Sequence, residues 1–225
     1  MSTEVAEHYE ATRERLIALA RELDDDDAAT PVPTCPGWTV FDVYAHLTGL
    51  CADVLVGRLE GVATDPWTAI QVEARRGRPF NDVIDEWEAD GPPFEAAMRS
   101  FGDKADPRVV IDALTHEQDV RGSLGRPGGR EVAAVGFAVS RMVPGFGRGW
   151  EGRGLAPVRI IGSSGSWVLG EGDPVATMQA PDIELLRVLV GRRSRAQALA
   201  LWDGDGEPFV DHLVAFSFAE RDIIE

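Results

Sequence analysis

Apolar residues recur at helical spacing in several stretches of the N-terminal part of the chain. The pattern predicts helices over residues 3–23, 40–59, 80–101, 107–124 and 131–143. Proline lacks the N–H that a helix needs, so Gly91-Pro92-Pro93 is expected to kink or split the third helix and Pro144 to stop the last. The stretch between the second and third helices is interpreted as a loop.

The pattern changes after Trp150, where shorter apolar runs follow. They predict a hairpin from strands at 158–162 and 167–170, a strand at 174–180, helices at 183–190 and 196–202, and a helix or strand at 210–218. The polar turn Ser163–Ser166 joins the two hairpin strands. The expected architecture is mainly α, with a four-helix bundle over residues 1–150 and a small α+β domain over 151–225.

Composition limits the classes of molecule that the protein is expected to bind. The 225 residues carry a formal net charge of −16, which opposes binding to nucleic acid or to an anionic membrane surface. No apolar run approaches the roughly 20 residues of a membrane span, and the N-terminus does not resemble a signal peptide. The two cysteines, Cys35 and Cys51, form no disulfide framework, and a cytoplasmic location is expected. One basic cluster is interpreted as part of a solvated loop, with attraction of an anion as the alternative: Arg75, Arg76 and Arg78.

Two residues of the fourth predicted helix are candidate metal ligands. Asp112 and His116 are four positions apart, so their side chains lie on one helical face. His46, on the second predicted helix, is a candidate third ligand, and its alternative role is that of a hydrogen-bonded core histidine. Two imidazoles and one carboxylate that leave a coordination position open are typical of a catalytic zinc site, although iron, nickel and manganese also accept this set.

Other polar residues near these ligands have two interpretations each. Asp119 either fixes the tautomer of a ligand histidine or pairs with Arg121 on the helix surface. Glu117 is expected to face solvent, and is the substitute ligand if Asp112 is too short. Cys35 precedes a predicted helix and is interpreted as part of a packed turn rather than a reactive thiol.

Three segments carry a resemblance to a known family. The first is Cys35-Pro36-Gly37-Trp38-Thr39-Val40 followed by Ala45-His46-Leu47, and the second is the stretch from Asp112 to Arg121 with its acidic-x-x-x-His-x-x-Asp pattern. The third is the C-terminal stretch with Trp167, Gly172-Asp173-Pro174, Ala180-Pro181, Gly191-Arg192 and Trp202. Together they resemble the mycothiol-dependent maleylpyruvate isomerase family of the DinB-like four-helix-bundle superfamily.

The resemblance implies a divalent metal, typically zinc, held by His46, Asp112 and His116, with Asp standing where the family usually has Glu. It also implies that the cofactor is mycothiol, the low-molecular-weight thiol of actinobacteria. The thiolate would add to an electrophilic small molecule, in either an isomerase or an S-transferase. Arg192, or its neighbour Arg193, would bind an anionic substrate, and Asp119 would support catalysis.

A second class of function stays open beside this one. The chain would then be a non-catalytic DinB-like module that binds a metal or small ligand, or regulates a partner. The chain is expected to be a monomer or a homodimer.

Overall fold

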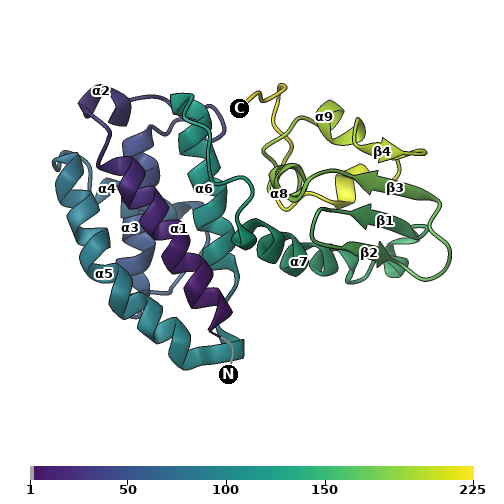
Figure 1. Ribbon diagram of the computed structural model, residues 1–225, viewed down its shortest axis with the longest axis horizontal. Coiled ribbons are helices and arrows are strands. Elements are labelled where there is room, and N and C mark those ends of the chain that lie inside the picture. The colour runs from purple at the N-terminus through teal and green to yellow at the C-terminus, as the bar shows by residue number, and fades with distance from the viewer. Residues whose placement is uncertain (1–2) are drawn as a thin grey trace. The chain divides into compact units, whose positions relative to one another are not determined.

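The computed structural model describes residues 3–225 and divides the chain into two compact units. The first unit comprises the chain up to Gly129 together with Glu225, and the second runs from Arg130 to Ile224. The helices of the first unit are α1 (Glu4–Ala20), α2 (Asp25–Ala28), α3 (Val40–Leu55), α4 (Asp65–Glu73), α5 (Phe80–Phe101) and α6 (Arg108–Leu124) (Figure 1).

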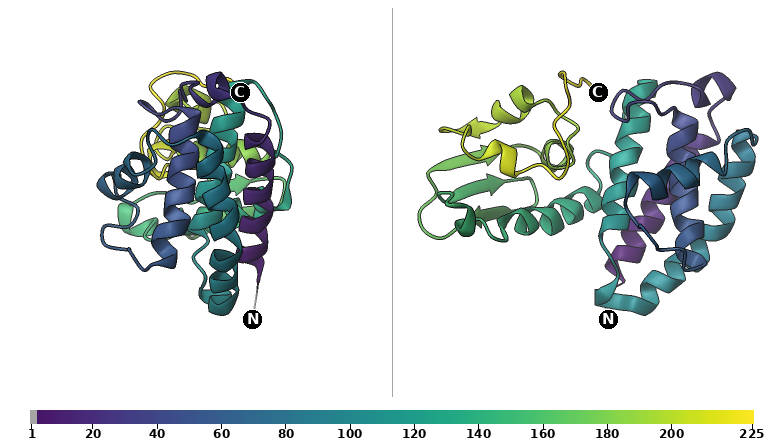
Figure 2. Two further views of the ribbon diagram at one scale, coloured as in Figure 1. Left: turned by 90° about the vertical axis from the view of Figure 1, so that its left-hand side faces the viewer. Right: turned by 180° about the vertical axis from the view of Figure 1, so that it is seen from behind.

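Four of these helices form the predicted bundle. Helix α3 packs against α5 and α6, and α1 packs against the same two helices, which closes a ring (Figure 2). Each helix buries one apolar stripe, and α3 is buried on most of its surface, because α4 covers a further side of it. The core residues include Leu16, Tyr44, Leu47, Trp87 and Leu114.

Helix α4 lies where a loop was expected. Thr64 precedes the helix in extended conformation and Pro66 stands in its first turn, where its missing N–H costs nothing. Only Trp67, Gln71 and Val72 are buried along its nine residues, which is too few to produce a clear helical period in the sequence. Tertiary packing against α3 therefore stabilises a helix that its own sequence specifies weakly.

The prolines end neither of the two helices that contain them. Helix α5 is continuous through Pro92 and Pro93 and bends along its length (Figure 1). Gly91 leaves room there for Arg13 of α1, because a Cβ at this position would lie 2.4 Å from the Arg13 Nε atom. Helix α7 (Ala133–Gly147) also runs past Pro144, so the expected stop at that residue is wrong.

The second unit is a small α+β structure. Its sheet has the strand order β2-β1-β3-β4, in which only the β1–β3 pair is parallel. Its elements are α7, β1 (Val158–Ile161), β2 (Ser166–Leu169), β3 (Ala176–Gln179), α8 (Asp182–Leu189), α9 (Arg195–Leu199) and β4 (Trp202–Asp203). The hairpin and the third strand are confirmed, and the segment after Val210 contains one short 3-10 turn, Val210–His212.

Helix α7 belongs to this second unit, because it packs against α8 and β2. The boundary between the units therefore follows Gly129 rather than the expected position near residue 150. A helical period shows that α7 exists, but it does not show which core its apolar stripe joins.

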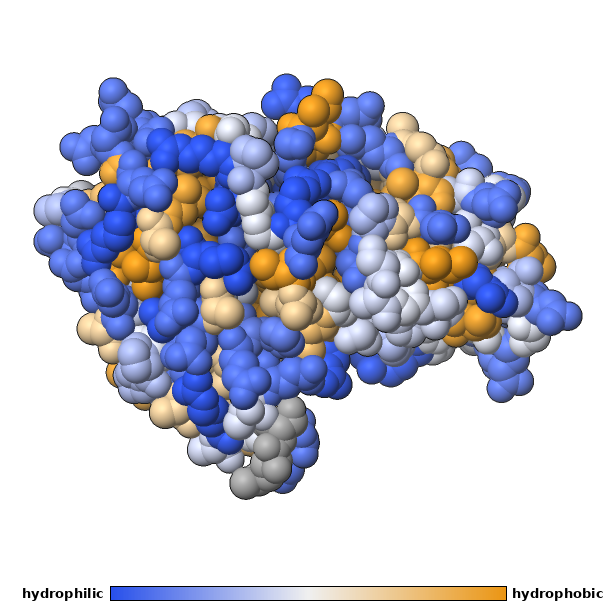
Figure 3. All heavy atoms as spheres, viewed as in Figure 1, coloured by the Kyte–Doolittle hydropathy of each residue, from blue (hydrophilic) through white to orange (hydrophobic). Residues whose placement is uncertain are grey.

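The visible face of the helical unit is mostly hydrophilic (Figure 3), in keeping with the composition. No helix of the described residues 3–225 is both long and apolar enough to cross a membrane.

Candidate metal centre

Helices α3 and α6 bring the three candidate ligands to one place. His46 comes from α3, and Asp112 and His116 come from α6. The Nε2 atom of His46 lies 3.2 Å from Oδ2 of Asp112, and Nε2 of His116 lies 3.6 Å from Oδ1 of the same carboxylate. One ligand atom from each of the three residues lies within 4.8 Å of the others.

The start of α3 sets the position of His46 along the bundle. The backbone N–H of Thr39 donates to the Asp42 carboxylate at 2.9 Å, and the N–H of Asp42 donates to the Thr39 hydroxyl at 3.3 Å. This reciprocal capping box fixes the first turn of the helix, as the sequence motif suggests.

A side chain of α4 orients the His46 ring. The Gln71 amide nitrogen donates to Asp53 at 3.0 Å, so the amide oxygen is left to accept from Nδ1 of His46 at 2.8 Å. This arrangement places a proton on Nδ1 and leaves Nε2 facing Asp112, where it can donate to the carboxylate when protonated or bind a cation when it is not. Gly49 permits it, because a Cβ there would lie 2.4 Å from Cβ of Gln71 and would push α4 away.

Asp119 orients the second imidazole in the same way. Its Oδ2 atom lies 3.1 Å from Nδ1 of His116 and accepts a hydrogen bond from it. The carboxylate is held in turn by the Thr34 hydroxyl at 2.8 Å and by the Cys35 thiol at 3.3 Å, both from the segment before α3. Both histidines therefore present Nε2 to Asp112.

Electrostatics at the centre favour a positive charge. Burial of the ring lowers the pKa of His46, but the Asp112 carboxylate and the hydrogen bonds with Asp112 and Gln71 raise it more, so the net shift is upward. The same half-buried carboxylate, which faces two imidazoles, would attract a cation.

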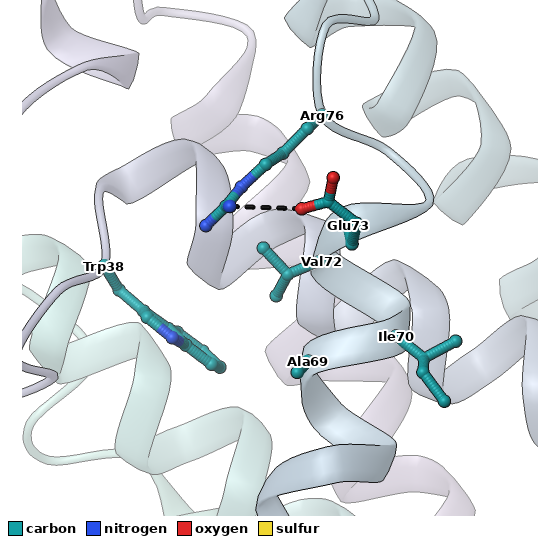
Figure 4. A pocket seen from close by; sticks show the side chains of 6 residues that line it. All are labelled: Trp38, Ala69, Ile70, Val72, Glu73 and Arg76. Carbon is teal, nitrogen blue, oxygen red and sulfur yellow. Dashed lines mark hydrogen bonds and ion pairs between the residues drawn. The ribbon is translucent and has the colours of Figure 1, made fainter.

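A pocket of about 350 Å³ adjoins the centre within the same unit. Trp38 belongs to both, because its ring lies 5.5 Å from the His46 ring and stacks at 6.0 Å on the His116 ring, measured between centroids. Across the pocket from Trp38, Figure 4 shows side chains of α4 and the turn after it. The lining residues on that side are Ala69, Ile70, Val72, Glu73 and Arg76.

Comparison with known proteins identifies the first unit. Residues 9–133 match the family described as the mycothiol maleylpyruvate isomerase N-terminal domain. The chain belongs to this family. Neither a curated protein nor a solved structure matches it.

The three residues fit the metal that the mycothiol maleylpyruvate isomerase family implies. A tetrahedral ion with metal–ligand distances near 2.0–2.2 Å separates its N and O ligand atoms by about 3.3–3.5 Å. Each imidazole lies near that distance from a different carboxylate oxygen, His46 at 3.2 Å from Oδ2 and His116 at 3.6 Å from Oδ1, and one ligand atom from each residue lies within 4.8 Å of the others. Asp112 reaches toward both imidazoles despite being one methylene shorter than the Glu that is usual in this family.

Glu117 takes no part in this centre, and the expectation that it faces solvent is wrong. It is 0% exposed and points to the opposite side of α6. There it accepts hydrogen bonds from Arg15 at 2.6 Å and from Arg121 at 3.1 Å. Glu117 therefore forms a buried ion pair and is not a substitute ligand.

The basic cluster divides into two kinds of residue. Arg75 is buried and pairs with Glu86 of α5, so it is not part of a solvated loop, whereas Arg78 pairs with the same carboxylate but stays exposed. Arg76 alone lines the pocket, where it pairs with Glu73 at 3.1 Å and with Asp42 at 3.5 Å.

Arg192 and Arg193 lie in the second unit. Nη1 of Arg192 donates to the Val190 carbonyl at 3.3 Å, and buried Arg193 pairs with Glu184 at 2.9 Å. A role for Arg192 in substrate binding stays a prediction.

Sequence reasoning missed three contributors to the centre. Gln71 and Asp53 lie outside every motif, and they matter only because α4 packs on α3. Thr34 was also unnoticed. The nearest signal was a polar residue, Gln71, between the apolar Ile70 and Val72 in a segment interpreted as loop.

Proposed function

We propose that this protein is a metal-dependent enzyme that adds the thiolate of mycothiol to an electrophilic small molecule. The observation that supports it best is the convergence of His46, Asp112 and His116 at one point of a mycothiol maleylpyruvate isomerase N-terminal domain. Zinc is the expected ion, because two imidazoles and a carboxylate form a common catalytic zinc set.

Each residue of the centre has a distinct task in this proposal. His46 and His116 hold the ion through Nε2, and Asp112 supplies the negative ligand. Gln71 and Asp119 position the two rings by accepting hydrogen bonds from their Nδ1–H groups. A bound divalent metal favours the thiolate over the thiol at neutral pH.

The adjoining pocket gives the reactants a place to bind. Trp38 packs beside both imidazoles and forms one wall of it, so a molecule in the pocket would lie next to the ligand set. Arg192 of the second unit is our candidate for binding an anionic group of the electrophile.

Two reactions fit the same chemistry. In an isomerase the sulfur–carbon bond forms at a cis double bond, the former double bond rotates, and the sulfur–carbon bond breaks again to release the trans product and the thiol. In an S-transferase the adduct takes up a proton and leaves as the product. The isomerase requires the adduct to stay bound, whereas the transferase requires its release.

Metal content provides the first test. The protein is purified without added metal as wild type, His116→Ala and His8→Ala, the last being a control because His8 lies on α1 outside the centre. We expect one zinc per chain in the wild type and in His8→Ala, and its loss from His116→Ala. Each protein is then incubated with mycothiol and either maleylpyruvate or a panel of electrophiles, and fumarylpyruvate and thiol adducts are measured.

The same experiment separates the alternative function. Stoichiometric metal without any fumarylpyruvate or adduct would contradict the enzyme and favour a metal-binding module. Wild-type protein that holds no zinc even after zinc is added back would contradict the metal centre itself.

A further inference from the structure

A second group of potential ligands shares His116 with the first. It consists of Cys35, His116 and Asp119, whose ligand atoms also lie within 4.8 Å of one another. Its histidine atom is Nδ1, the nitrogen that the first centre does not use. Cys35 comes from the turn before α3, where its own N–H donates to the Val32 carbonyl and its carbonyl accepts from the Trp38 N–H.

The distances in this second group match those around a single ion. Sγ of Cys35 lies 3.3 Å from Oδ2 of Asp119 and 3.9 Å from Nδ1 of His116, and Nδ1 lies 3.1 Å from the same Oδ2. Tetrahedral zinc with Zn–S near 2.3 Å and Zn–N and Zn–O near 2.0 Å would separate these atoms by about 3.3–3.6 Å. Shifts of a few tenths of an ångström would therefore complete a coordination set.

We propose that Cys35, Nδ1 of His116 and Asp119 form a second cation site, which selects thiophilic divalent ions and cannot be filled together with the first. The proposal does not depend on thiol-transfer activity, because it concerns the free chain and its own side chains.

The donor atoms determine which cations the second site prefers. The second site offers a thiolate and a carboxylate, hence two negative charges, whereas the first offers one carboxylate and two neutral imidazoles. Soft thiolate ligands select soft cations such as Cd²⁺, whereas two imidazoles and a carboxylate form a common catalytic zinc set. Asp119 is 1% exposed and Cys35 is half-buried, so the ion would be held largely away from water.

Proton positions make the two sites exclusive. Binding at the second site removes the Cys35 thiol proton to solvent and requires the His116 proton to move from Nδ1 to Nε2. Nε2 then has no lone pair for the first site, and its N–H points toward Oδ1 of Asp112 at 3.6 Å. Simultaneous occupancy would require an imidazole without either proton. A cation at Cys35 would therefore displace the one that His46 helps to hold.

Cadmium is a suitable probe, because its bond to a thiolate produces an ultraviolet charge-transfer band. Metal-free full-length protein is titrated with Cd²⁺ while the band and the bound cadmium per chain are measured. We expect one cadmium per chain, with the band, in the wild type. Cys35→Ser should lose the band and bind Cd²⁺ at least about 10–100-fold more weakly, since loss of even a supporting residue costs that much.

Three further variants separate ligation from other roles of Cys35. Thr34→Val removes a different hydrogen bond to Asp119 and should keep the band, as should Cys51→Ala, which removes the other cysteine. His46→Ala dismantles only the first site and should also keep the band. Circular dichroism of each variant checks that it is folded.

Three results would overturn the proposal. Cadmium bound without a thiolate band in the wild type would show that Cys35 only hydrogen-bonds to Asp119. A band that persists in Cys35→Ser, or one that disappears from folded His46→Ala, would place the ion elsewhere. Two cadmium ions per chain would contradict the exclusivity.

Discussion

The two sides of α6 bury carboxylates in opposite kinds of environment. Glu117 is 0% exposed and Asp119 is 1% exposed, two positions apart on the same helix. Glu117 faces two guanidinium groups, those of Arg15 and Arg121. Asp119 receives its hydrogen bonds from an imidazole, a thiol and a hydroxyl.

The difference distinguishes a structural carboxylate from a functional one. Guanidinium groups, which are permanently charged, compensate the charge of Glu117, so this carboxylate has a structural role. The donors to Asp119 include two candidate metal ligands, His116 and Cys35, and Asp112 on the same side of α6 faces two imidazoles. Burial alone does not identify a site, whereas the chemistry of the partners does.

The largest expected effect comes from removing the charge on the structural side. Glu117→Gln should lower the free energy of unfolding by about 3–5 kcal/mol, because it leaves two guanidinium groups beside a neutral amide at a buried position. Urea denaturation followed by circular dichroism measures the change. Metal content of the folded fraction should stay as in the wild type.

A matched control is Glu14→Gln, an exposed carboxylate on α1 whose loss should change stability by less than about 0.5 kcal/mol. Equal effects of the two variants, or loss of metal from Glu117→Gln, would remove the distinction between the two sides of α6.

On the functional side, Asp119→Asn should weaken zinc binding by about 10–100-fold, because it removes the carboxylate that fixes the His116 tautomer. Zinc affinity is measured by competition with a chromophoric chelator. The loss of unfolding free energy should be smaller than for Glu117→Gln. If zinc affinity is unchanged, Asp119 does not position His116.

The second unit contains a less buried version of the Glu117 arrangement. Burial raises the pKa of Glu184, but Arg193 and Arg130 lower it more, so the net shift is downward from 4.5. A lowered pKa in the folded state stabilises the fold above pH 4.5, and the stabilisation disappears as the pH falls through the folded-state pKa.

Glu184→Gln should therefore lower the free energy of unfolding by about 1–2 kcal/mol at neutral pH. The difference from wild type should shrink as the pH falls below 4.5. Urea denaturation at several pH values tests this. A constant difference across the whole range would mean that the charge of Glu184 contributes nothing.

Arg76→Ala should have the smallest effect on the fold. Its side chain is 54% exposed, its partner Glu73 is exposed and its contact with the buried Asp42 is 3.5 Å long, so the unfolding free energy should change by less than about 1 kcal/mol. Because Arg76 lines the pocket, the variant should raise the KM for a pocket ligand while zinc content stays constant. A larger loss of stability than in Glu184→Gln would make Arg76 a structural residue like Arg75.

Local pattern was enough to predict most of the helices. Periodic apolar positions marked α1, α3, α5 and α6 because each helix buries a stripe against the others. The same reasoning missed α4, whose stability depends on α3, and placed the unit boundary after α7 instead of before it. Tertiary packing decides whether a short helix forms and which core a helix joins, and the apolar pattern of one segment does not show that packing.

The sequence by itself determined the pairing of Asp112 with His116, because residues four apart on a helix must share a face. It also indicated the family to which the chain belongs. Only the tertiary structure decided which segments meet that pair. Gln71 reaches His46 from α4, Cys35 and Thr34 reach Asp119 from the turn before α3, and Arg15 neutralises Glu117 from α1. Helical geometry is fixed within one turn of chain, whereas these contacts join residues 25 to 102 positions apart and exist only once the helices pack.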